Sequence, residues 1–370
     1  MNLRDLLQKD IRQQGAIPFV RFMQQALYAP NLGYYSSGKD IFGARGDFIT
    51  APELTPLFGY TLANQCQQVL STITSPVLFE FGAGSGQLSV DILTQLERLG
   101  CLPAQYQILE VSAHLQERQR ALIALKIPHL AHLVQWCSTW PTTPFSGVVI
   151  ANEVLDAMPV HRFLQTKDGL LESFITLNDQ DEWTEIFNPC RNQSLIKHVH
   201  QVLSCDTYPY QSEANLFIDD WIRQCGAMLE RGAFFIIDYG FPRHEYYHPQ
   251  RSTGTLMCHY QHHAHAMPLL HVGEQDITAH VDFTHVAEAA DAALFHVAGY
   301  TNQAAFLLNN GLLNLLMTMD ESHQKIQAQQ AVKKLVQPNE MGELFKVMAL
   351  TKNYNQPLNG FSSQDKRASL

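Results

Sequence analysis

The sequence predicts an α/β protein organised around a mostly parallel β-sheet. Short apolar runs, of which residues 77–81 are a clear example, alternate along the chain with segments whose apolar residues recur at helical spacing. Strands that alternate with helices pair in parallel through right-handed crossovers. A glycine-rich turn at residues 82–86 joins one of these strands to the next helix. Because ligands of such sheets bind beyond the carboxyl ends of the strands, this turn marks the predicted site.

Each helix and strand is predicted from the spacing of its apolar residues. Helices are expected at 3–15, 18–29, 55–70, 88–99, 114–125, 212–230, 283–292 and 301–336. Strands are expected at 77–81, 106–111, 132–136, 147–151, 233–240, 294–298 and 344–351, with β-hairpins between 160 and 187 and an irregular segment at 241–282. The predicted domains are an N-terminal helical or lid extension at 1–70 and an α/β domain at 71–370, with insertions at about 160–230 and 241–282.

Composition excludes several classes of protein. A net charge of −10 without a dense run of Lys and Arg argues against a nucleic-acid binder. The 7 cysteines form no Cys-x-x-Cys pair, so neither a zinc ribbon nor a disulfide scaffold is indicated, and reduced thiols in a cytoplasm are the simplest account. No apolar stretch reaches the roughly 18 residues that a membrane-spanning helix needs. The N-terminus lacks the features of a secretory or transit peptide.

The glycine turn is the strongest indication of a ligand. Glycine adopts the positive φ angles of a tight bend, and the helix behind the turn carries partial positive charge at its N-terminus. A dinucleotide fingerprint requires a third glycine or alanine where this chain has Gln87, and an acid about 20 residues further on. Here Glu80 precedes the turn, and the next strand ends with Glu110, whose carboxylate can accept both hydroxyls of a ribose. A turn without a ligand remains the alternative. The predicted cofactor contacts of this stretch are Glu80, Gly82, Gly84, Gly86 and Glu110.

These residues are similar to motif I and the second acidic position of Rossmann-like S-adenosylmethionine (SAM) methyltransferases. Over nearly its whole length the chain resembles the MidA-like SAM-dependent methyltransferases, whose mitochondrial members are the protein arginine methyltransferase required for assembly of respiratory complex I. The glycine turn is shared by many methyltransferases, whereas the other motifs are more specific to this family. The resemblance rests on these segments: 27–28, 33–35, 46–53, 58–59, 80–86, 152–159, 238–240 and 273–283.

The resemblance implies a Rossmann-like class I methyltransferase fold with a mostly parallel seven-stranded sheet, an N-terminal helical extension and an inserted region of β-hairpins and loops. It implies SAM as the cofactor and a protein arginine, possibly in a complex I subunit, as the methyl acceptor. Because the first motif begins close to residue 1, we expect a cytoplasmic, bacterial protein. A homodimer is one option for its oligomeric state.

Acidic residues after the fourth strand are the first candidates for catalysis. An always-charged guanidinium is best held by carboxylates that bind it in a bidentate manner. Glu153 and Asp156 have this chemistry, although acids also occur at helix N-termini for structural reasons. Asn152 ends the same strand and is a predicted cofactor contact, and Asp47 is predicted to belong to a lid over the cofactor. His280 and Asp282 are candidates for the acceptor side.

The sequence leaves two alternative functions open, and it does not predict a metal site. The histidines at 259, 262, 263, 265 and 271 do not match the spacing of a known metal site, and methyl transfer from SAM needs no metal. A dinucleotide oxidoreductase is disfavoured by Gln87 and by the distant acid. A catalytically silent assembly factor that keeps the SAM fold to bind a respiratory subunit is the alternative from another class.

Overall fold

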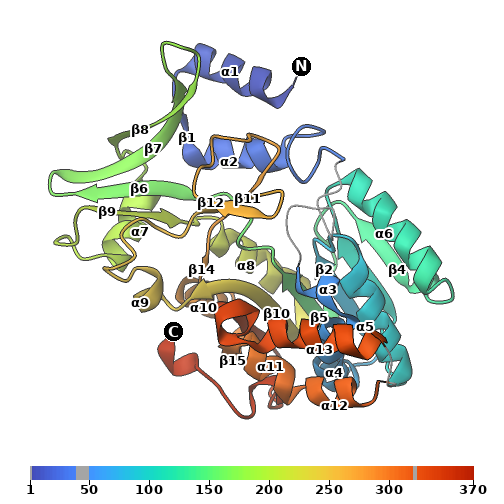
Figure 1. Cartoon of the computed structure of the whole chain (residues 1–370). Helices are drawn as coiled ribbons and strands as arrows, with labels where there is room; N and C mark the ends of the chain where they lie inside the picture. Colours follow the sequence, from blue (N-terminus) through green and yellow to red (C-terminus); the bar gives the residue numbers. More distant parts are fainter. Residues whose placement is uncertain (1, 39–49, 320–322) are drawn as a thin grey trace. The chain divides into compact units, whose positions relative to one another are not determined.

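The computed structural model describes residues 2–38, 50–319 and 323–370, and its contacts divide the chain into two units (Figure 1). The first unit comprises Met1–Phe48, Leu155–Asp219 and Phe241–Asp282. The second comprises Ile49–Val154, Asp220–Gly240 and Phe283–Leu370. Residues 50–70, which the sequence assigns to an N-terminal extension, fall in the second unit, as do residues 220–230 of the first predicted insertion. Residues 160–219 and the second predicted insertion fall in the first unit with the N-terminal residues.

The second unit contains the mostly parallel sheet that the sequence predicts. Its strands follow the order β15-β16-β10-β5-β2-β3-β4. From β10 to β4 the neighbouring strands are parallel, whereas β16 is antiparallel to both β10 and β15. The strands are β2 (Val77–Phe81), β3 (Gln105–Leu109), β4 (Val134–Cys137), β5 (Phe145–Asn152), β10 (Leu229–Phe241), β15 (His296–Asn302) and β16 (Phe345–Lys352).

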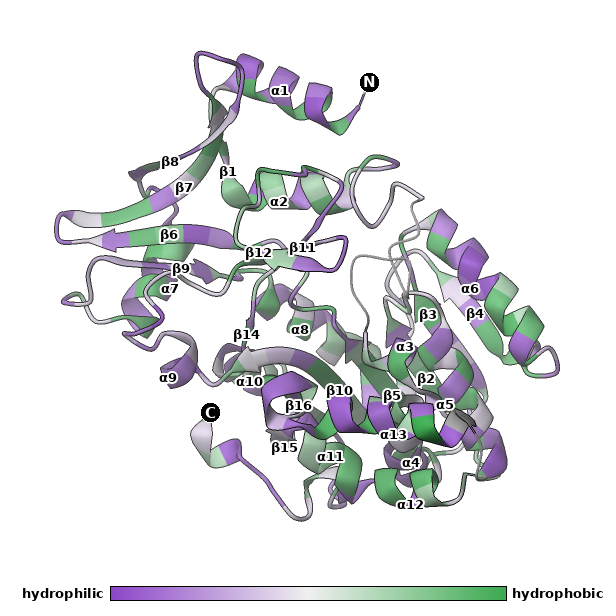
Figure 2. Cartoon of the chain, viewed as in Figure 1, coloured by the Kyte–Doolittle hydropathy of each residue, from purple (hydrophilic) through white to green (hydrophobic). Residues whose placement is uncertain are grey.

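Helices surround this sheet and bury its apolar residues. Figure 2 shows that α6 and α13 carry both hydrophilic and hydrophobic residues, as expected for helices with one buried side. The core is continuous from Leu62 in α4 through Ile150 in β5 to Val347 in β16. The helices of this unit are α3 (Ala51–Leu54), α4 (Pro56–Leu70), α5 (Gln87–Arg98), α6 (Ala113–Lys126), α8 (Ile218–Met228), α10 (Phe283–Ala292), α11 (Gln303–Asn309), α12 (Leu312–Met317) and α13 (His323–Val336), with short turns at Ala131–Leu133, Pro338–Gly342, Asn359–Phe361 and Arg367–Ser369.

The first unit is built on antiparallel strands. Its larger sheet has the order β1-β7-β6-β9 with β8 paired to β7, and a smaller sheet has the order β12-β11-β13. Aromatic and aliphatic residues such as Phe22 and Ile175 form its core. Its elements are α1 (Leu3–Gln14), β1 (Ile17–Pro18), α2 (Phe19–Tyr28), β6 (His161–Thr166), β7 (Gly169–Leu177), β8 (Trp183–Pro189), α7 (Gln193–Val202), β9 (Tyr210–Ala214), α9 (Arg243–Tyr246), β11 (Met257–Tyr260), β12 (His263–His265), β13 (Asp276–Thr278) and β14 (Val281–Asp282).

Several predicted boundaries are wrong for identifiable reasons. The helix expected at 212–230 begins only at Ile218, because residues 210–214 pair with β6 as strand β9. Helix α7 was not predicted. The strand expected at 294–298 continues to Asn302, and the helix expected at 301–336 is divided, since Gly311 with φ +88° separates α11 from α12. In each case pairing or a left-handed glycine overrides the local apolar spacing.

Candidate active site

The carboxyl ends of three strands lie level with one another. Phe81 in β2 is in register with Leu109 in β3 and with Ala151 in β5. The next residue on each strand therefore lies at the same edge of the sheet: Gly82, Glu110 and Asn152. The sequence thus correctly predicts that these three positions share one edge, although Glu110 follows Gly82 by 28 positions and Asn152 follows Glu110 by 42.

The glycine turn has the backbone conformation that its sequence requires. Gly82, Gly84 and Gly86 have φ angles of +55°, +53° and +88°, which L-residues with a side chain rarely adopt. Gly86 is the N-cap of α5, so the turn leads directly into a helix N-terminus. Ser85 fixes the turn, because its hydroxyl donates to Glu53 in α3 and accepts from the backbone N of Gln87 at 3.2 Å.

Glu110 is a buried carboxylate with capacity for further hydrogen bonds. It is 5 % exposed, its Oε1 accepts from the backbone N of Ser112 at 3.0 Å, and its Oε2 accepts from Nε2 of Gln119 at 3.1 Å. Burial raises the pKa of this carboxyl, and the two hydrogen bonds oppose the rise. Because each carboxylate oxygen offers about two acceptor positions, both oxygens can accept a further hydroxyl.

The carboxylate of Glu80 is buried and hydrogen-bonded to side chains of α5 and β3. Its Oε2 accepts from the hydroxyls of Ser89 at 2.5 Å and Tyr106 at 2.7 Å, and the residue is 2 % exposed. Burial is the main reason that the pKa of Glu80 rises to about 7. These contacts connect β2 to α5 and β3, so they support the turn; a direct contact of Glu80 with the cofactor stays a prediction.

The turn after β5 holds Glu153 in a left-handed conformation. Glu153 has φ +53°, which costs a non-glycine residue roughly 1–2 kcal/mol and is typical of functional positions. Asn152 Nδ2 donates to Glu153 Oε1 at 3.1 Å. The buried Asp238 at the end of β10 anchors this turn, because its carboxylate accepts from the backbone N of Val154 at 3.2 Å and of Tyr239 at 2.9 Å. Asp238 lay in a recognised motif, but the sequence did not show that it positions Glu153.

The three remaining catalytic candidates lie in the first unit. Asp156 is 3 % exposed, and its carbonyl accepts from the backbone N of Ala279 at 2.9 Å. The ring of His280 stacks on Phe241 with an angle of 1° between the planes and 5.3 Å between the centroids. Asp282 forms an ion pair with Arg243 at 3.2 Å, so part of its carboxylate is used within the unit.

Tyrosines and acids gather in the same unit. The rings of Tyr28 and Tyr35 stack with centroids 5.6 Å apart, and the Tyr35 hydroxyl donates to Oδ1 of Asp276 at 2.8 Å. Burial raises the pKa of Tyr35 well above its usual value, and the nearby charges of Asp276 and Asp156 raise it further. Asp156 therefore lies near partly buried aromatic rings and a second carboxylate, a combination that attracts cations.

Asp47, which the sequence predicts to belong to a lid over the cofactor, lies outside the described residues. Within residues 2–38, 50–319 and 323–370, no three His, Cys, Asp or Glu side chains are grouped to hold a metal ion. His271 instead stacks on Tyr260 at 3.9 Å between centroids. None of the helices formed by these residues has the length and hydrophobicity needed to cross a bilayer.

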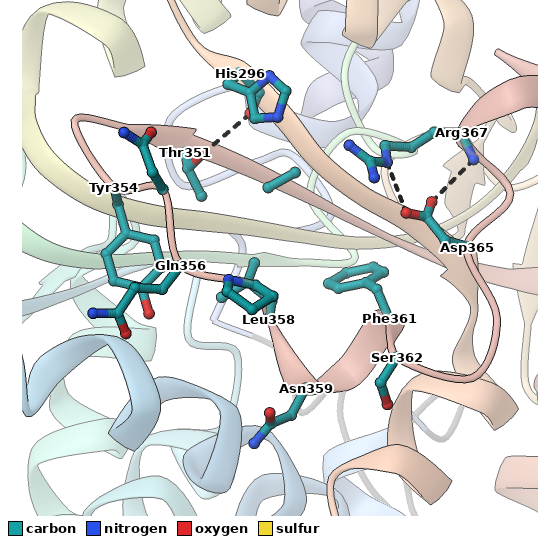
Figure 3. A pocket seen from close by; sticks show the side chains of 13 residues that line it. His296, Thr351, Tyr354, Gln356, Leu358, Asn359, Phe361, Ser362, Asp365 and Arg367 are labelled. Carbon is teal, nitrogen blue, oxygen red and sulfur yellow. Dashed lines mark hydrogen bonds and ion pairs between the residues drawn. The ribbon is translucent and has the colours of Figure 1, made fainter.

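A cavity of about 540 Å³ occurs elsewhere in the sheet unit (Figure 3). It is lined by residues of β15, the end of β16 and the C-terminal segment, among them His296, Tyr354 and Phe361. Because β16 is antiparallel, its end at Lys352 lies level with Gly232 near the start of β10. The cavity is thus at the edge of the sheet opposite the glycine turn and does not belong to the site described above.

The residues at the glycine turn fit a nucleoside cofactor. Glu110 can accept two hydroxyls, and the three left-handed glycines keep side chains away from the turn. Oδ1 of Asn152 is buried and has no hydrogen-bond partner among the described residues, so it can accept a hydrogen bond from a ligand.

Gln119 is a residue of this site that the sequence did not predict. Its amide connects Glu110 to the glycine turn. A glutamine in a helix gives no signal that would distinguish it from surface residues.

The fold and this edge are those of a class I SAM-dependent methyltransferase. A family model described as "Putative S-adenosyl-L-methionine-dependent methyltransferase" matches residues 61–301. Since this match covers more than half of the 370 residues, the chain belongs to that family, and its cofactor is SAM. The dinucleotide oxidoreductase considered from the sequence is thereby ruled out.

Solved structures and named proteins agree with this assignment. A protein of Burkholderia thailandensis, crystallised with bound S-adenosyl-homocysteine, is 41% identical, has a TM-score of 0.95, and is matched over 100% of this chain and 96% of its own. A native crystal structure from the same organism is 40% identical with a TM-score of 0.92, over 100% and 96% of the two chains. The "Protein arginine methyltransferase NDUFAF7, mitochondrial" of Mus musculus is 29% identical over 99% of this chain and 87% of its own length; that of Homo sapiens is 28% identical over 94% and 82%.

Proposed function

We propose that the chain transfers a methyl group from SAM to an arginine side chain of a protein. The similarity to the NDUFAF7 arginine methyltransferases, which extends over nearly the whole chain, supports this choice of acceptor. The resemblance noted in the sequence analysis points to a complex I subunit, or a bacterial counterpart, as that protein. Two bacterial proteins at about 40% identity and 7 free thiols support a bacterial, cytoplasmic setting.

The observation that carries the proposal is the conformation of Glu153. It is a half-buried carboxylate directly after β5, at the cofactor edge, and it keeps an unfavourable φ of +53° because Asp238 and Asn152 hold its turn. A residue that only capped a helix would not need this conformation. A carboxylate held in this way can accept hydrogen bonds from a guanidinium and fix its orientation.

The first unit offers a second group of suitable side chains. Asp156 and Asp276 are both at most 3 % exposed and lie close to Tyr35. Carboxylates and aromatic rings together stabilise a planar cation better than either group alone. We therefore assign Asp156 to acceptor binding as the candidate of this unit, and regard His280 and Asp282 as residues that shape the same unit through Phe241 and Arg243.

Each cofactor residue has a separate task. Bound SAM supplies an activated methyl group on a sulfonium, so the protein mainly orients the acceptor and excludes water. Both oxygens of Glu110 would accept the ribose hydroxyls, Oδ1 of Asn152 would accept from a further donor, and the backbone of the glycine turn would allow close approach of the ligand. Glu153, at the cofactor edge, would balance the positive charge of the acceptor guanidinium.

The test uses SAM labelled in its methyl group and a total protein extract of cells that lack this chain. The wild type is expected to label protein, and hydrolysis should recover the label in methylarginine. Glu153→Gln and Asp156→Asn are each expected to slow labelling roughly 10–100-fold, the worth of one hydrogen bond to a charged group, while binding S-adenosylhomocysteine like the wild type. Exposed Glu117→Gln in α6 is the matched control and should keep the full rate.

The outcomes separate the competing functions. Label recovered in another amino acid would overturn the arginine acceptor. Binding of S-adenosylhomocysteine without label in any protein would favour the silent assembly factor. A full rate in either variant would show that the residue replaced in it does not bind the acceptor.

A further inference from the structure

One buried side chain connects the glycine turn and Glu110 to strand β4. Gln119 in α6 is 0 % exposed, and its Nε2 donates to the carbonyl of Gly84 at 3.0 Å and to Oε2 of Glu110 at 3.1 Å. Its Oε1 accepts from Nε1 of Trp136 at 2.8 Å. Both hydrogens and the oxygen of the amide are therefore used, each by a different element.

The orientation of this amide is determined by its neighbours. The Trp136 ring nitrogen can only donate, so it must face the amide oxygen. The carbonyl of Gly84 and the Glu110 carboxylate can only accept, so they must face the amide nitrogen. A flipped amide would satisfy none of the three partners, and no smaller polar side chain spans them.

Gln119 also limits the space around the turn. A Cβ placed on Gly86 would lie 3.2 Å from Cγ of Gln119, which is tighter than most contacts. The side chain thus packs against one glycine of the turn while it donates to the carbonyl of another. Through these contacts the glycine turn and the ribose-binding acid are fixed with respect to each other.

We propose that Gln119 is a positioning residue for cofactor binding, which orients the Glu110 carboxylate against the glycine turn so that both of its oxygens face the ribose hydroxyls. This inference rests on the role of Glu110 in the proposed function, but not on the identity of the methyl acceptor. Without the Nε2 donor, Oε2 of Glu110 loses the hydrogen bond from Gln119, and the carboxylate can rotate away from the turn. The ligand groups that then lose affinity are the ribose hydroxyls, not the adenine or the amino acid.

The experiment compares two ligands in each variant by calorimetric titration: S-adenosylhomocysteine and its 2′,3′-dideoxy analogue. The wild type is expected to prefer the natural ligand roughly 10–100-fold, because hydrogen bonds from hydroxyls to a carboxylate are strong. Gln119→Met keeps the volume and removes every hydrogen bond, so this preference should fall to within about threefold. Affinity for the dideoxy analogue should change little. General loosening of the fold would weaken both ligands alike and leave the ratio unchanged.

The same helix provides a matched control. Gln116 donates from Nε2 to the backbone carbonyl of Glu110 at 2.7 Å, so it contacts the same residue but not its carboxylate. Gln116→Met should retain the wild-type preference. If Gln119→Met does not fold, Gln119→Glu serves instead, because it keeps an acceptor for Trp136 and loses both donors.

Two results would overturn the inference. A Gln119 variant that keeps the full preference for the hydroxylated ligand would show that Gln119 does not act through Glu110. A wild type without any preference would show that Glu110 does not bind the ribose, and the inference would fall with that assignment. Neither result bears on the arginine acceptor, which the labelling experiment tests separately.

Discussion

Replacing Asp91 with asparagine is expected to stabilise the protein above neutral pH. Asp91 lies in α5 and is 3 % exposed; its Oδ1 accepts from Nε2 of Gln87 at 2.7 Å, whereas its Oδ2 is buried and has no hydrogen-bond partner among the described residues. Burial is the main reason that the pKa of this carboxyl rises from 3.8 to about 7. The negative charge of Glu53 nearby adds to the rise.

The direction of the pH effect follows from proton binding. A carboxyl with a raised pKa binds its proton more tightly in the folded protein, so its favourable contribution is complete below pH ~4 and is lost as the pH rises through about 7. A rise from 3.8 to about 7 corresponds to ~4 kcal/mol of unfolding free energy well above neutral pH. Asparagine avoids this loss but buries an amide at a cost of ~1–3 kcal/mol, so the net gain at pH 8 is ~2 kcal/mol.

Thermal unfolding followed by circular dichroism at pH 5, 6.5 and 8 measures this effect. A gain of ~2 kcal/mol raises the midpoint by a few degrees in a protein of this size. At pH 5 the variant should be no more stable than the wild type. Burial also raises the pKa of Glu80 to about 7, so this residue too makes the unfolding free energy fall as the pH rises. The Asp91→Asn variant should therefore keep part of the pH dependence of the wild type. Exposed Glu117→Gln is the control. A difference between Asp91→Asn and the wild type that is equal at all three pH values would refute the reasoning.

Three further predictions concern the cofactor edge. S-adenosylhomocysteine at 100 times its dissociation constant should stabilise the fold by about 2.7 kcal/mol in a thermal shift assay, whereas NADH should not; equal shifts would contradict the assigned cofactor. Gly86→Ala should lower the unfolding free energy by ~1–2 kcal/mol, because φ is +88° and the new Cβ meets Gln119 at 3.2 Å; an unchanged urea midpoint would argue against that conformation. Asp238→Asn should slow methyl transfer more than it weakens S-adenosylhomocysteine binding, because an amide cannot accept from both Val154 and Tyr239; a loss of binding alone would count against its role in positioning Glu153.

Much of the cofactor edge could be predicted because it depends on local sequence. The glycines at 82, 84 and 86 are needed for backbone angles that few other residues adopt, and acids after strands are visible in a single chain. The α/β alternation then places Gly82, Glu110 and Asn152 at one edge, because parallel strands all end there.

The features that were missed depend on contacts between distant segments. Residues 210–214 have the composition of a helix start but form a strand, because β6 offers a pairing edge. The positioning roles of Gln119 and Asp238 were not predicted, because each role depends on a hydrogen bond to a distant residue. Gln119 donates to the carbonyl of Gly84, and Asp238 accepts from the backbone N of Val154. Neither the residue type nor the spacing reveals such partners.

The position of the last strand has a consequence for how the protein can be made. β16 follows both β10 and β15 in the sequence, yet it lies between them in the sheet and pairs with both. A nascent chain therefore carries β10 and β15 without this partner until residues 345–352 have left the ribosome, and these strand edges are open to wrong pairing in the meantime. A chain cut short before residue 345 lacks the strand that joins β15 to the sheet, so such a truncation should disrupt the methyltransferase even though the glycine turn is intact.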